Sequence, residues 1–500
     1  YIKVTGAGTA DLRLTNLVST SGATVTVAGT SGNDALSFAA GASSHTVTVN
    51  GVSYSFAASS YNAFSLSGAA GTDSVTLTGT SGDETVTLTP TSATFVGNSF
   101  SANGSGFEHA IANGNGGLDR AFVYDSAGDD TLTVGPTRLT LVGNGFSLQA
   151  DGFHRTFAYA SDGLDRAFMH DSTGDDTYEG HATWSRMYGD GFYNWASRFD
   201  RVFARASSGS DRALMYDSMG DDTFDAYHNW GRLYGDGFYN YASNFDRMIA
   251  FASEGLDRAF LHDSNGNDTF EGREKSSRLY GDDYYNLAAG FSRVFAYAST
   301  GWDRAFLYDS AGNDHFEGRH NWSRLYGDGF YNWAGGFGRV FGYGSSGYDQ
   351  ATLLMQTSGD TFDDNGSWSR AYNDNYYNYV GRFDNISAIA PSQASASATA
   401  AVGQAGGSVA ALATTPRPDP NKEIDLATNT ESSKVHTRSG PVNGDEITIA
   451  SELVVDPKAS AVYKLSRYTE ETSTDSAFAS LEGADLDPTV VAIENVIAPL

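Results

Sequence analysis

The stretch that decides the fold covers residues 165–210 and reads DRAFMHDSTGDDTYEGHATWSRMYGDGFYNWASRFDRVFARASSGS. Its segments are short, rich in aromatic residues and bounded by Gly, Asp, Asn and Ser, which is typical of strands separated by turns. No segment has a 3.6-residue hydrophobic pattern, and glycine is too frequent for stable helices. The stretch therefore predicts β-structure throughout.

The same unit recurs along the chain with a period of 46 residues. No insertion or deletion interrupts it between residue 71 and about residue 384. Because surface loops normally tolerate length changes, this strictness indicates that each unit stacks on its neighbour in a solenoid. The residues expected to form stacking ladders are Asp119, Asp165, Asp211, Asp257, Asp303, Tyr188, Tyr234, Tyr280, Tyr326, Asn194, Asn240, Asn286 and Asn332.

The predicted fold is an all-β parallel β-helix, or β-solenoid, followed by a tail without the repeat. Residues 1–70 are Thr- and Val-rich and resemble degenerate repeats, and residues 71–390 form the regular array. Residues 391–420 have the composition of a flexible linker. Residues 421–500 contain strand-like runs and are expected to form a small β element for capping or subunit exchange. A half-length similarity favours two coils per repeat, and one large coil is the alternative.

Composition excludes several classes of function. There are 31 basic and 60 acidic residues, a net charge of −29, which argues against nucleic acid and anionic lipid as partners. The chain has no cysteine, so disulfides, zinc–thiolate sites, iron–sulfur clusters and cysteine nucleophiles are excluded. No apolar run reaches about 18 residues, so membrane insertion is not expected. The chain begins at Tyr1 without methionine, and we expect it to be cut from a longer precursor.

The repeat also resembles known proteins. GTSGDETVTLTPTSATF at 79–95, followed by units such as DRAFLYDSAGNDHFEG, resembles the large repetitive surface proteins of planctomycetes and related bacteria. The Gly-Asn-Asp turns resemble the calcium-binding repeats of RTX proteins, although RTX repeats return about every nine residues. The resemblance covers roughly residues 20–385 and implies a secreted, cell-surface location more than an activity.

Aspartate columns are the main candidates for chemistry. A column of ionised carboxylates repels itself unless cations, arginines or hydrogen bonds compensate. One interpretation is that each Asp caps a turn, with the arginine that follows it, as at Arg166, supplying local charge. The other is that Ca²⁺ lies between neighbouring turns as a structural cofactor. The expected metal ligands are then Asp130, Asp176, Asp222, Asp268 and Asp314.

Aromatic columns have two interpretations as well. An outer row containing Trp195, Trp230, Trp302, Trp322 and Trp333 could bind sugar rings. Stacked Tyr and Asn side chains could equally hold neighbouring coils together. His170 and His262 replace tyrosine in one column, which predicts a position tolerant of different rings and not a metal site.

No catalytic constellation is present in the sequence, so we expect a protein that is not an enzyme. The leading hypothesis is an extracellular structural subunit of a fibre, filament or surface layer that self-associates head to tail through the solenoid ends or the tail. The alternatives are an adhesin that binds surface glycans through its aromatic face and, less favoured, a β-helical polysaccharide lyase or hydrolase.

Overall fold

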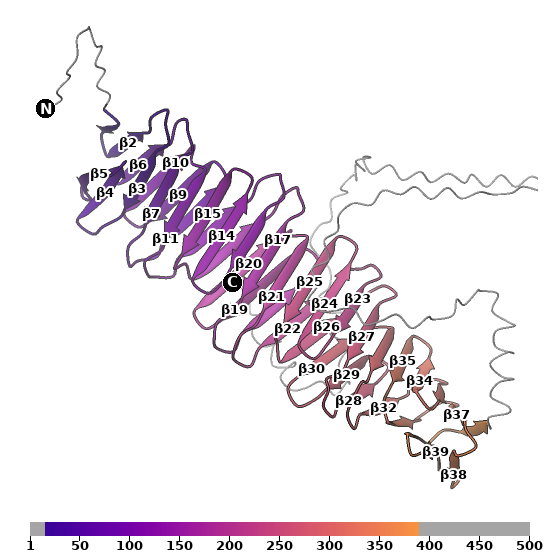
Figure 1. Cartoon of the computed structure of the whole chain (residues 1–500). Helices are drawn as coiled ribbons and strands as arrows, with labels where there is room; N and C mark the ends of the chain where they lie inside the picture. Colours follow the sequence, from indigo (N-terminus) through magenta and orange to yellow (C-terminus); the bar gives the residue numbers. More distant parts are fainter. Residues whose placement is uncertain (1–15, 390–500) are drawn as a thin grey trace, which may run out of the picture. The chain divides into compact units, whose positions relative to one another are not determined.

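A computed structural model describes residues 16–389, and these residues form β-strands joined by short turns (Figure 1). The described part contains 41 strands and no helix, so it offers no helix that could cross a membrane. Two long sheets pack against each other through one continuous core, which confirms the predicted all-β solenoid. The predictions for 391–420 and 421–500 lie outside the described residues.

The larger sheet, called sheet A here, has 21 strands. In spatial order its strands are β1 (Val18–Ser21), β2 (Thr24–Ala28), β6 (Ala63–Ser67), β10 (Phe100–Ser105), β9 (Ser92–Gly97), β8 (Thr85–Thr89), β12 (Arg120–Tyr124), β16 (Arg155–Tyr159), β20 (Phe192–Ser197), β19 (Trp184–Gly189), β18 (Thr177–Gly180), β22 (Arg212–Tyr216), β26 (Arg247–Phe251), β30 (Tyr285–Ala289), β29 (Ser276–Tyr280), β28 (Thr269–Gly272), β32 (Arg304–Tyr308), β36 (Arg339–Tyr343), β40 (Tyr376–Gly381), β39 (Trp368–Asn373) and β38 (Thr361–Asp364).

The facing sheet, sheet B, contains the other 20 of the 41 strands (41 − 21) and is open, because its two outermost strands each have a single neighbour. In spatial order its strands are β5 (Val52–Ala57), β4 (Ser44–Val49), β3 (Ala35–Ala39), β7 (Ser74–Thr78), β11 (His109–Asn113), β15 (Phe146–Asp151), β14 (Arg138–Gly143), β13 (Thr131–Val134), β17 (Arg166–His170), β21 (Arg201–Arg205), β25 (Phe238–Ser243), β24 (Trp230–Gly235), β23 (Thr223–Ala226), β27 (Arg258–His262), β31 (Arg293–Tyr297), β35 (Phe330–Gly335), β34 (Trp322–Gly327), β33 (His315–Gly318), β37 (Gln350–Leu354) and β41 (Asn385–Ile389).

Each regular repeat contributes five strands, as the unit from β17 to β21 shows. Strand β17 lies in sheet B, and the chain then crosses to sheet A for the antiparallel meander β18, β19 and β20. It returns to sheet B for β21, which pairs in parallel with β17. A third crossing leads to β22 in sheet A, so equivalent strands of consecutive repeats lie in opposite sheets.

This odd number of crossings corrects the expected stacking of residues 46 positions apart. Parallel neighbours in the regular array are instead 35 or 38 positions apart, as Arg166 and Arg201 are, and Arg201 and Tyr239. Identical surroundings return only after two repeats (46 + 46 = 92 residues), which add five strands to each sheet, or about 24 Å. A repeat is therefore neither one coil nor two. The predicted continuous columns do not exist for Asp119, Asp165, Asp211, Asp257, Asp303, Tyr188, Tyr234, Tyr280, Tyr326, Asn194, Asn240, Asn286 and Asn332.

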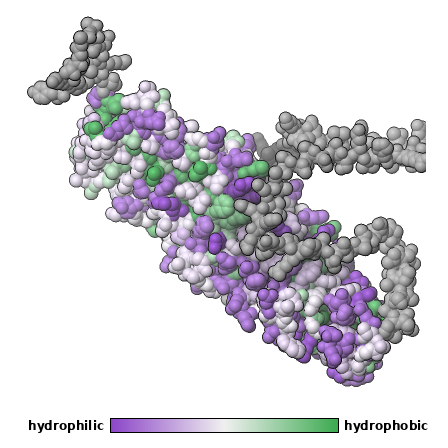
Figure 2. Space-filling view, viewed as in Figure 1, coloured by the Kyte–Doolittle hydropathy of each residue, from purple (hydrophilic) through white to green (hydrophobic). Residues whose placement is uncertain are grey.

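The core lies between the sheets because each strand alternates inward and outward residues. In β17, Ala167 and Met169 are fully buried and point inward, while Arg166 and His170 are exposed. Asn194 points inward from sheet A, and its Nδ2 donates a hydrogen bond to the carbonyl of Gly135 beyond the end of β13 in sheet B, at 3.0 Å. The predicted Asn positions therefore join the two sheets across the core. The face drawn in Figure 2 is mostly polar, with hydrophobic residues in small patches.

Candidate metal sites in the crossing turns

The first crossing of each repeat is a closed turn with the pattern Asp-Ser-x-Gly-Asp/Asn-Asp. In residues 171–176, the backbone N–H and hydroxyl of Ser172 donate to Oδ2 of Asp176 at 2.9 and 2.7 Å. The N–H of Gly174 donates to the Ser172 hydroxyl at 3.1 Å. Asp176 is thereby drawn into the interior of the turn, where it is 1% exposed.

A second turn, 35 residues further along the chain, stacks on the first. The Asp176 N–H donates to Oδ1 of Asp211 at 2.8 Å, and the Ser207 N–H donates to Oδ2 of Asp171 at 2.6 Å. Gly209 has φ of 137°, and a Cβ there would overlap the Gly174 carbonyl, so only glycine permits this approach. The stacked turns bring three carboxylates together.

Five such three-carboxylate clusters occur in the described residues. Within each, one carboxylate oxygen per residue lies within 4.8 Å of the other two. Each cluster lies where a turn crosses between the sheets, and the strands that follow the turns of consecutive clusters belong alternately to sheet B and sheet A. The clusters are Asp125/Asp130/Asp165, Asp171/Asp176/Asp211, Asp217/Asp222/Asp257, Asp263/Asp268/Asp303 and Asp309/Asp314/Asp349.

The central aspartate of every cluster has a buried oxygen with no hydrogen-bond partner. In the second cluster this atom is Oδ1 of Asp176, which lies against Gly189 and Phe192 at the end of β19. A Cβ at Gly189 would overlap it, so glycine is required at that position. An unpartnered buried carboxylate oxygen is costly unless something positive compensates it. The same atom is unpartnered in Asp130, Asp222, Asp268 and Asp314.

In one turn at each end of the array, an asparagine side chain donates a hydrogen bond to the turn aspartate. The Asn50 amide donates to Oδ1 of Asp34 at 2.6 Å, and the Asn373 amide donates to Oδ1 of Asp360 at 2.8 Å. In these two turns the first aspartate of the pattern is replaced, by Gly29 in one case and by Met355 in the other. These two turns therefore have an amide donor and lack the third carboxylate.

The turn that contains Glu84 also lacks the third carboxylate. It has Gly79 at the first position, and Thr80 donates its N–H to Glu84 at 3.1 Å and its hydroxyl at 2.5 Å. Asp73 and Asp119, which stack on the N-terminal turns, each keep an unpartnered Oδ2. What distinguishes the five central clusters is therefore the unpartnered Oδ1 combined with the third carboxylate.

Burial and like charge raise the pKa of the first aspartate of each cluster turn and of the stacked Asp165, Asp211, Asp257 and Asp303. Burial, followed by the neighbouring carboxylates, raises the pKa of Asp211 to about 6 and that of Asp217 to about 7. In the end turns, hydrogen bonds outweigh the effect of burial and lower the pKa of Asp360 to about 2. The hydrogen bond from Asn50 lowers the pKa of Asp34. The central clusters therefore need protons or a cation near neutral pH, and the end turns do not.

The arginines that follow the aspartates do not supply this charge. Arg166 and its equivalents point outward from the sheets and make no ion pair with the cluster carboxylates in the described part of the chain. The predicted local neutralisation by arginine is therefore wrong. The atoms that could coordinate a cation in these clusters are carboxylate and carbonyl oxygens, which are the ligands that Ca²⁺ prefers.

Each position predicted as a metal ligand is the central member of one cluster. Of the five aspartates predicted to form a stacking ladder, four are the stacked members of clusters: Asp165, Asp211, Asp257 and Asp303. Asp119 instead stacks on Glu84 in a turn with two carboxylates, where the Glu84 N–H donates to its Oδ1 at 2.6 Å. The first aspartate of each turn was missed, although its 46-residue recurrence was visible in the sequence. These missed residues are Asp125, Asp171, Asp217, Asp263 and Asp309.

The predicted tyrosines face outward on the sheets. Tyr188 lies opposite Tyr193 across the β19–β20 hairpin, with ring centroids 6.3 Å apart, and its hydroxyl donates to Glu179 at 2.9 Å. His170 and His262 do not lie in one column with their 46-residue equivalents: His170 lies beside Arg205, whereas the His262 imidazole stacks between Tyr227 and Tyr297 at 4.1 and 5.0 Å. These contacts hold strands together along the outer faces.

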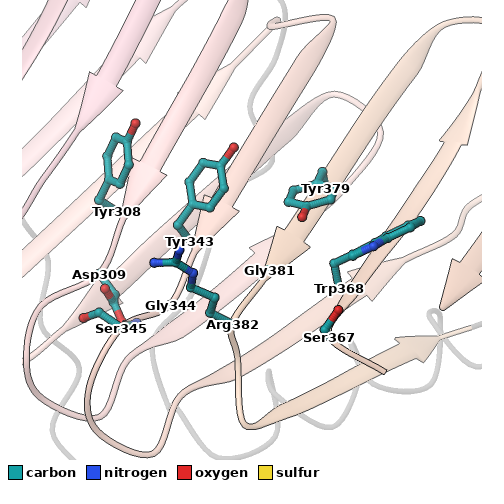
Figure 3. A pocket seen from close by; sticks show the side chains of 10 residues that line it. All are labelled: Tyr308, Asp309, Tyr343, Gly344, Ser345, Ser367, Trp368, Tyr379, Gly381 and Arg382. Atoms are coloured by element: carbon teal, nitrogen blue, oxygen red, sulfur yellow. Dashed lines mark hydrogen bonds between the residues drawn. The ribbon is translucent and has the colours of Figure 1, made fainter. Parts of the chain in front are cut away.

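A hollow of about 600 Å³ opens beside the last cluster. Figure 3 shows Tyr308, Tyr343, Tyr379 and Trp368 side by side on the outer face of sheet A, with Asp309 near the turn. Tyr308 and Tyr343 stack at 5.5 Å. Asp309 both lines this hollow and belongs to the last cluster, whereas Asp314 and Asp349 are buried behind it.

The comparisons with known proteins add no identity. No protein-family model matches the chain, and no curated protein matches it.

Proposed function

We propose that this protein is a secreted, non-catalytic structural rod at a cell surface, whose stacked turns bind Ca²⁺. Five equivalent carboxylate clusters with unpartnered buried oxygens support the calcium part of this proposal. The strict repeat supports the structural part, since it makes a long scaffold without a unique cleft. Each cluster would hold one ion through Asp171, Asp176 and Asp211 or their equivalents, with turn carbonyls completing the shell.

Calcium would stabilise the rod by linking turns that are 35 residues apart in the chain. Bound ions neutralise the carboxylates and stabilise the folded state, because an unfolded chain offers no formed site. At a free calcium concentration one hundred times Kd, each site adds about 2.7 kcal/mol.

The test is metal content together with thermal unfolding. We expect about five Ca²⁺ per chain by elemental analysis after dialysis into calcium, and a Tm lower in EGTA than in calcium by at least ten degrees. Equal Tm values in the two buffers, or fewer than one ion per chain, would refute the calcium part.

The sheet ends support head-to-tail assembly. Within the described residues, β5 and β41 each have one neighbour in sheet B, as do β1 and β38 in sheet A. Strand β5 also exposes Val52 and Tyr54, which are 56% and 37% accessible. Exposed strand edges favour addition of another chain. Negative-stain microscopy at high concentration with calcium should show filaments, and monodisperse rods would contradict self-assembly.

A further inference from the structure

Pairs of arginines project from the outer faces of both sheets. Arg258 of β27 lies directly beside Arg293 of β31 in parallel register, and both side chains are exposed. The same arrangement recurs once in every central repeat. The other pairs are Arg120/Arg155, Arg166/Arg201, Arg212/Arg247 and Arg304/Arg339.

Four of these pairs have no carboxylate counter-charge in the described part of the chain. No Asp or Glu oxygen lies within 4.0 Å of the guanidinium groups in the pairs other than Arg212/Arg247. Like charges directly opposite each other on neighbouring strands destabilise a sheet. The net charge of −29 opposes polyanions at long range, so the attraction must be local. In the described residues no carboxylate forms an ion pair with these four arginine pairs, and the surface at each pair is therefore locally positive. The arrangement therefore favours an external anion.

Flat aromatic surfaces lie beside most of these pairs. Phe260 and Phe295, two residues further along the same strands and on the same outer face, stack with centroids 5.2 Å apart at 14°. Phe122/Phe157, Phe168/Phe203 and Phe306/Phe341 stack in the same way next to their own arginine pairs, at 5.1, 5.1 and 5.0 Å.

A hollow in sheet B combines the two features. It has a volume of about 570 Å³ and is lined by Arg293, Phe295, Tyr326, Tyr331 and Leu256 among others. Guanidinium groups bind carboxylate or sulfate through charge-assisted hydrogen bonds. Aromatic faces accept the apolar face of a sugar ring, and tyrosine hydroxyls can hydrogen-bond its hydroxyl groups. Together these groups complement an acidic sugar.

We propose that the arginine pairs bind an anionic polysaccharide, a chain of sugar rings carrying carboxylate or sulfate groups, along the outer faces of the rod. Sheet A carries three pairs and sheet B carries two. On each face the pairs recur about every 24 Å, so that one long polymer would contact two or three pairs at once and gain affinity from multivalency. This goes beyond the structural role and does not depend on calcium in the clusters.

The chain contains regions that should not bind. At the equivalent register positions near the N-terminus, β7 and β11 pair Ser74 with His109, and near the C-terminal end β37 and β41 pair Gln350 with Asn385. Binding should therefore map to the central repeats between residues 120 and 343.

The experiment measures binding of the full chain in calcium-containing buffer to three polymers. The probes are dextran sulfate, neutral dextran and inorganic polyphosphate, immobilised separately. We expect dextran sulfate to bind at physiological salt, dextran to bind at least about 100-fold more weakly, and polyphosphate about tenfold more weakly at equal charge density. Absence of dextran sulfate binding would overturn the proposal, and equal binding of polyphosphate would reduce the site to a general polyanion patch.

Two double variants distinguish the contribution of an arginine pair to binding from the effect of the protein's overall charge. The double variant Arg258→Gln/Arg293→Gln should bind dextran sulfate about tenfold more weakly, while its Tm stays the same or rises because like charges are removed. The matched control, Arg198→Asn/Arg382→Asn, removes two exposed arginines in turns outside the pairs and should retain full affinity. Equal losses in both doubles would contradict a role for the pairs. Phe295→Ala should weaken dextran sulfate binding without changing polyphosphate binding.

Discussion

The turns at the two ends of the array differ from the turns in its centre in what surrounds the carboxylate of the turn aspartate. The turn at Asp34 and the central turns draw an aspartate inward and stack a second carboxylate on it; the Asp34 N–H, for example, donates to Asp73 Oδ1 at 2.7 Å. Asp360 is only partly buried, and its N–H donates to the Thr357 carbonyl. At the ends, Asn50 or Asn373 donates to Oδ1 of the turn aspartate. In the centre, glycine stands at the position of Asn373, as Gly189 and Gly327 do, so that no amide donates to this oxygen, and a third carboxylate is added.

This difference indicates what the central clusters lack. Losing a neutral donor and gaining a negative charge would both destabilise a turn that stood alone, because like charges repel and buried acceptors need partners. Both changes are favourable only if a cation occupies the centre. The end turns are self-sufficient, and the central turns are complete only with a ligand.

The largest expected effect tests how tightly the buried aspartate is held. Gly189→Ala places a Cβ onto Oδ1 of Asp176 and should destabilise the protein by about 3 kcal/mol or more, since the aspartate must leave the turn. Gly191→Ala is the matched control two residues away, where φ is 79° but the space is open. It should cost only about 1 kcal/mol. Denaturant unfolding of both variants measures the difference, and similar losses would contradict the tight contact.

Removing one negative charge should have opposite effects with and without calcium. In calcium, Asp176→Asn should lower the bound metal from about five ions to about four and reduce stability by about 1–3 kcal/mol. In EGTA the same variant should be more stable than the parent, because repulsion within the cluster falls. Thermal melts in the two buffers, with metal analysis, check this reversal of sign.

The matched change at an end turn is Asp34→Asn. It should leave the metal content unchanged and destabilise the protein equally in both buffers, because its partners are Thr30 and Asn50. A calcium-dependent effect of this variant would mean that the end turns also bind metal.

The two kinds of turn should respond oppositely to pH. Without calcium, Asp217 has a folded pKa of about 7 against an ordinary value of about 3.9, so the folded chain binds more protons. Stability in EGTA should therefore rise as pH falls from about 8 to about 5. Asp360, with a pKa of about 2, stabilises the fold above about pH 4 and loses this contribution as pH falls toward 2. In saturating calcium, stability should instead fall as pH decreases from about 8 to about 5, because protons compete with Ca²⁺ for the carboxylates. Melting curves from pH 3 to 8 test both directions.

The smallest expected effect concerns an orphaned oxygen that needs only a neutral donor. Oδ1 of Asn286 is buried without a partner because Gly231 stands where Ser277 donates to Asn332 at 2.9 Å in the next repeat. Gly231→Ser should supply the missing donor and stabilise the protein by about 1 kcal/mol once the Met248 side chain shifts. Gly231→Ala is the control without a hydroxyl. Equal Tm values for the two variants would show that the donor is not the cause.

Much of this could be predicted from the sequence, and the failures have one cause. The β-class, the repeat and the five central aspartates follow from turn residues and periodicity alone. The stacking partners did not follow, because the 46-residue period predicts that residues 46 positions apart lie on top of one another in the same sheet. Three crossings per repeat carry Asp165 to the opposite sheet from Asp119 and place it beside Asp130. The first aspartate of the turn was missed because its role appears only when the stacked turn is in place.

The sequence by itself determined that this chain builds a solenoid of strands, since glycine, aromatic and turn residues recur without a change in spacing and each must meet an equivalent neighbour. Only the tertiary structure decided which residues meet. Strand count and crossing number set a 35-residue offset between stacked turns, and this offset gathers three carboxylates and pairs the outer arginines. Local preferences act over a few residues, whereas the offset is a property of how whole repeats pack.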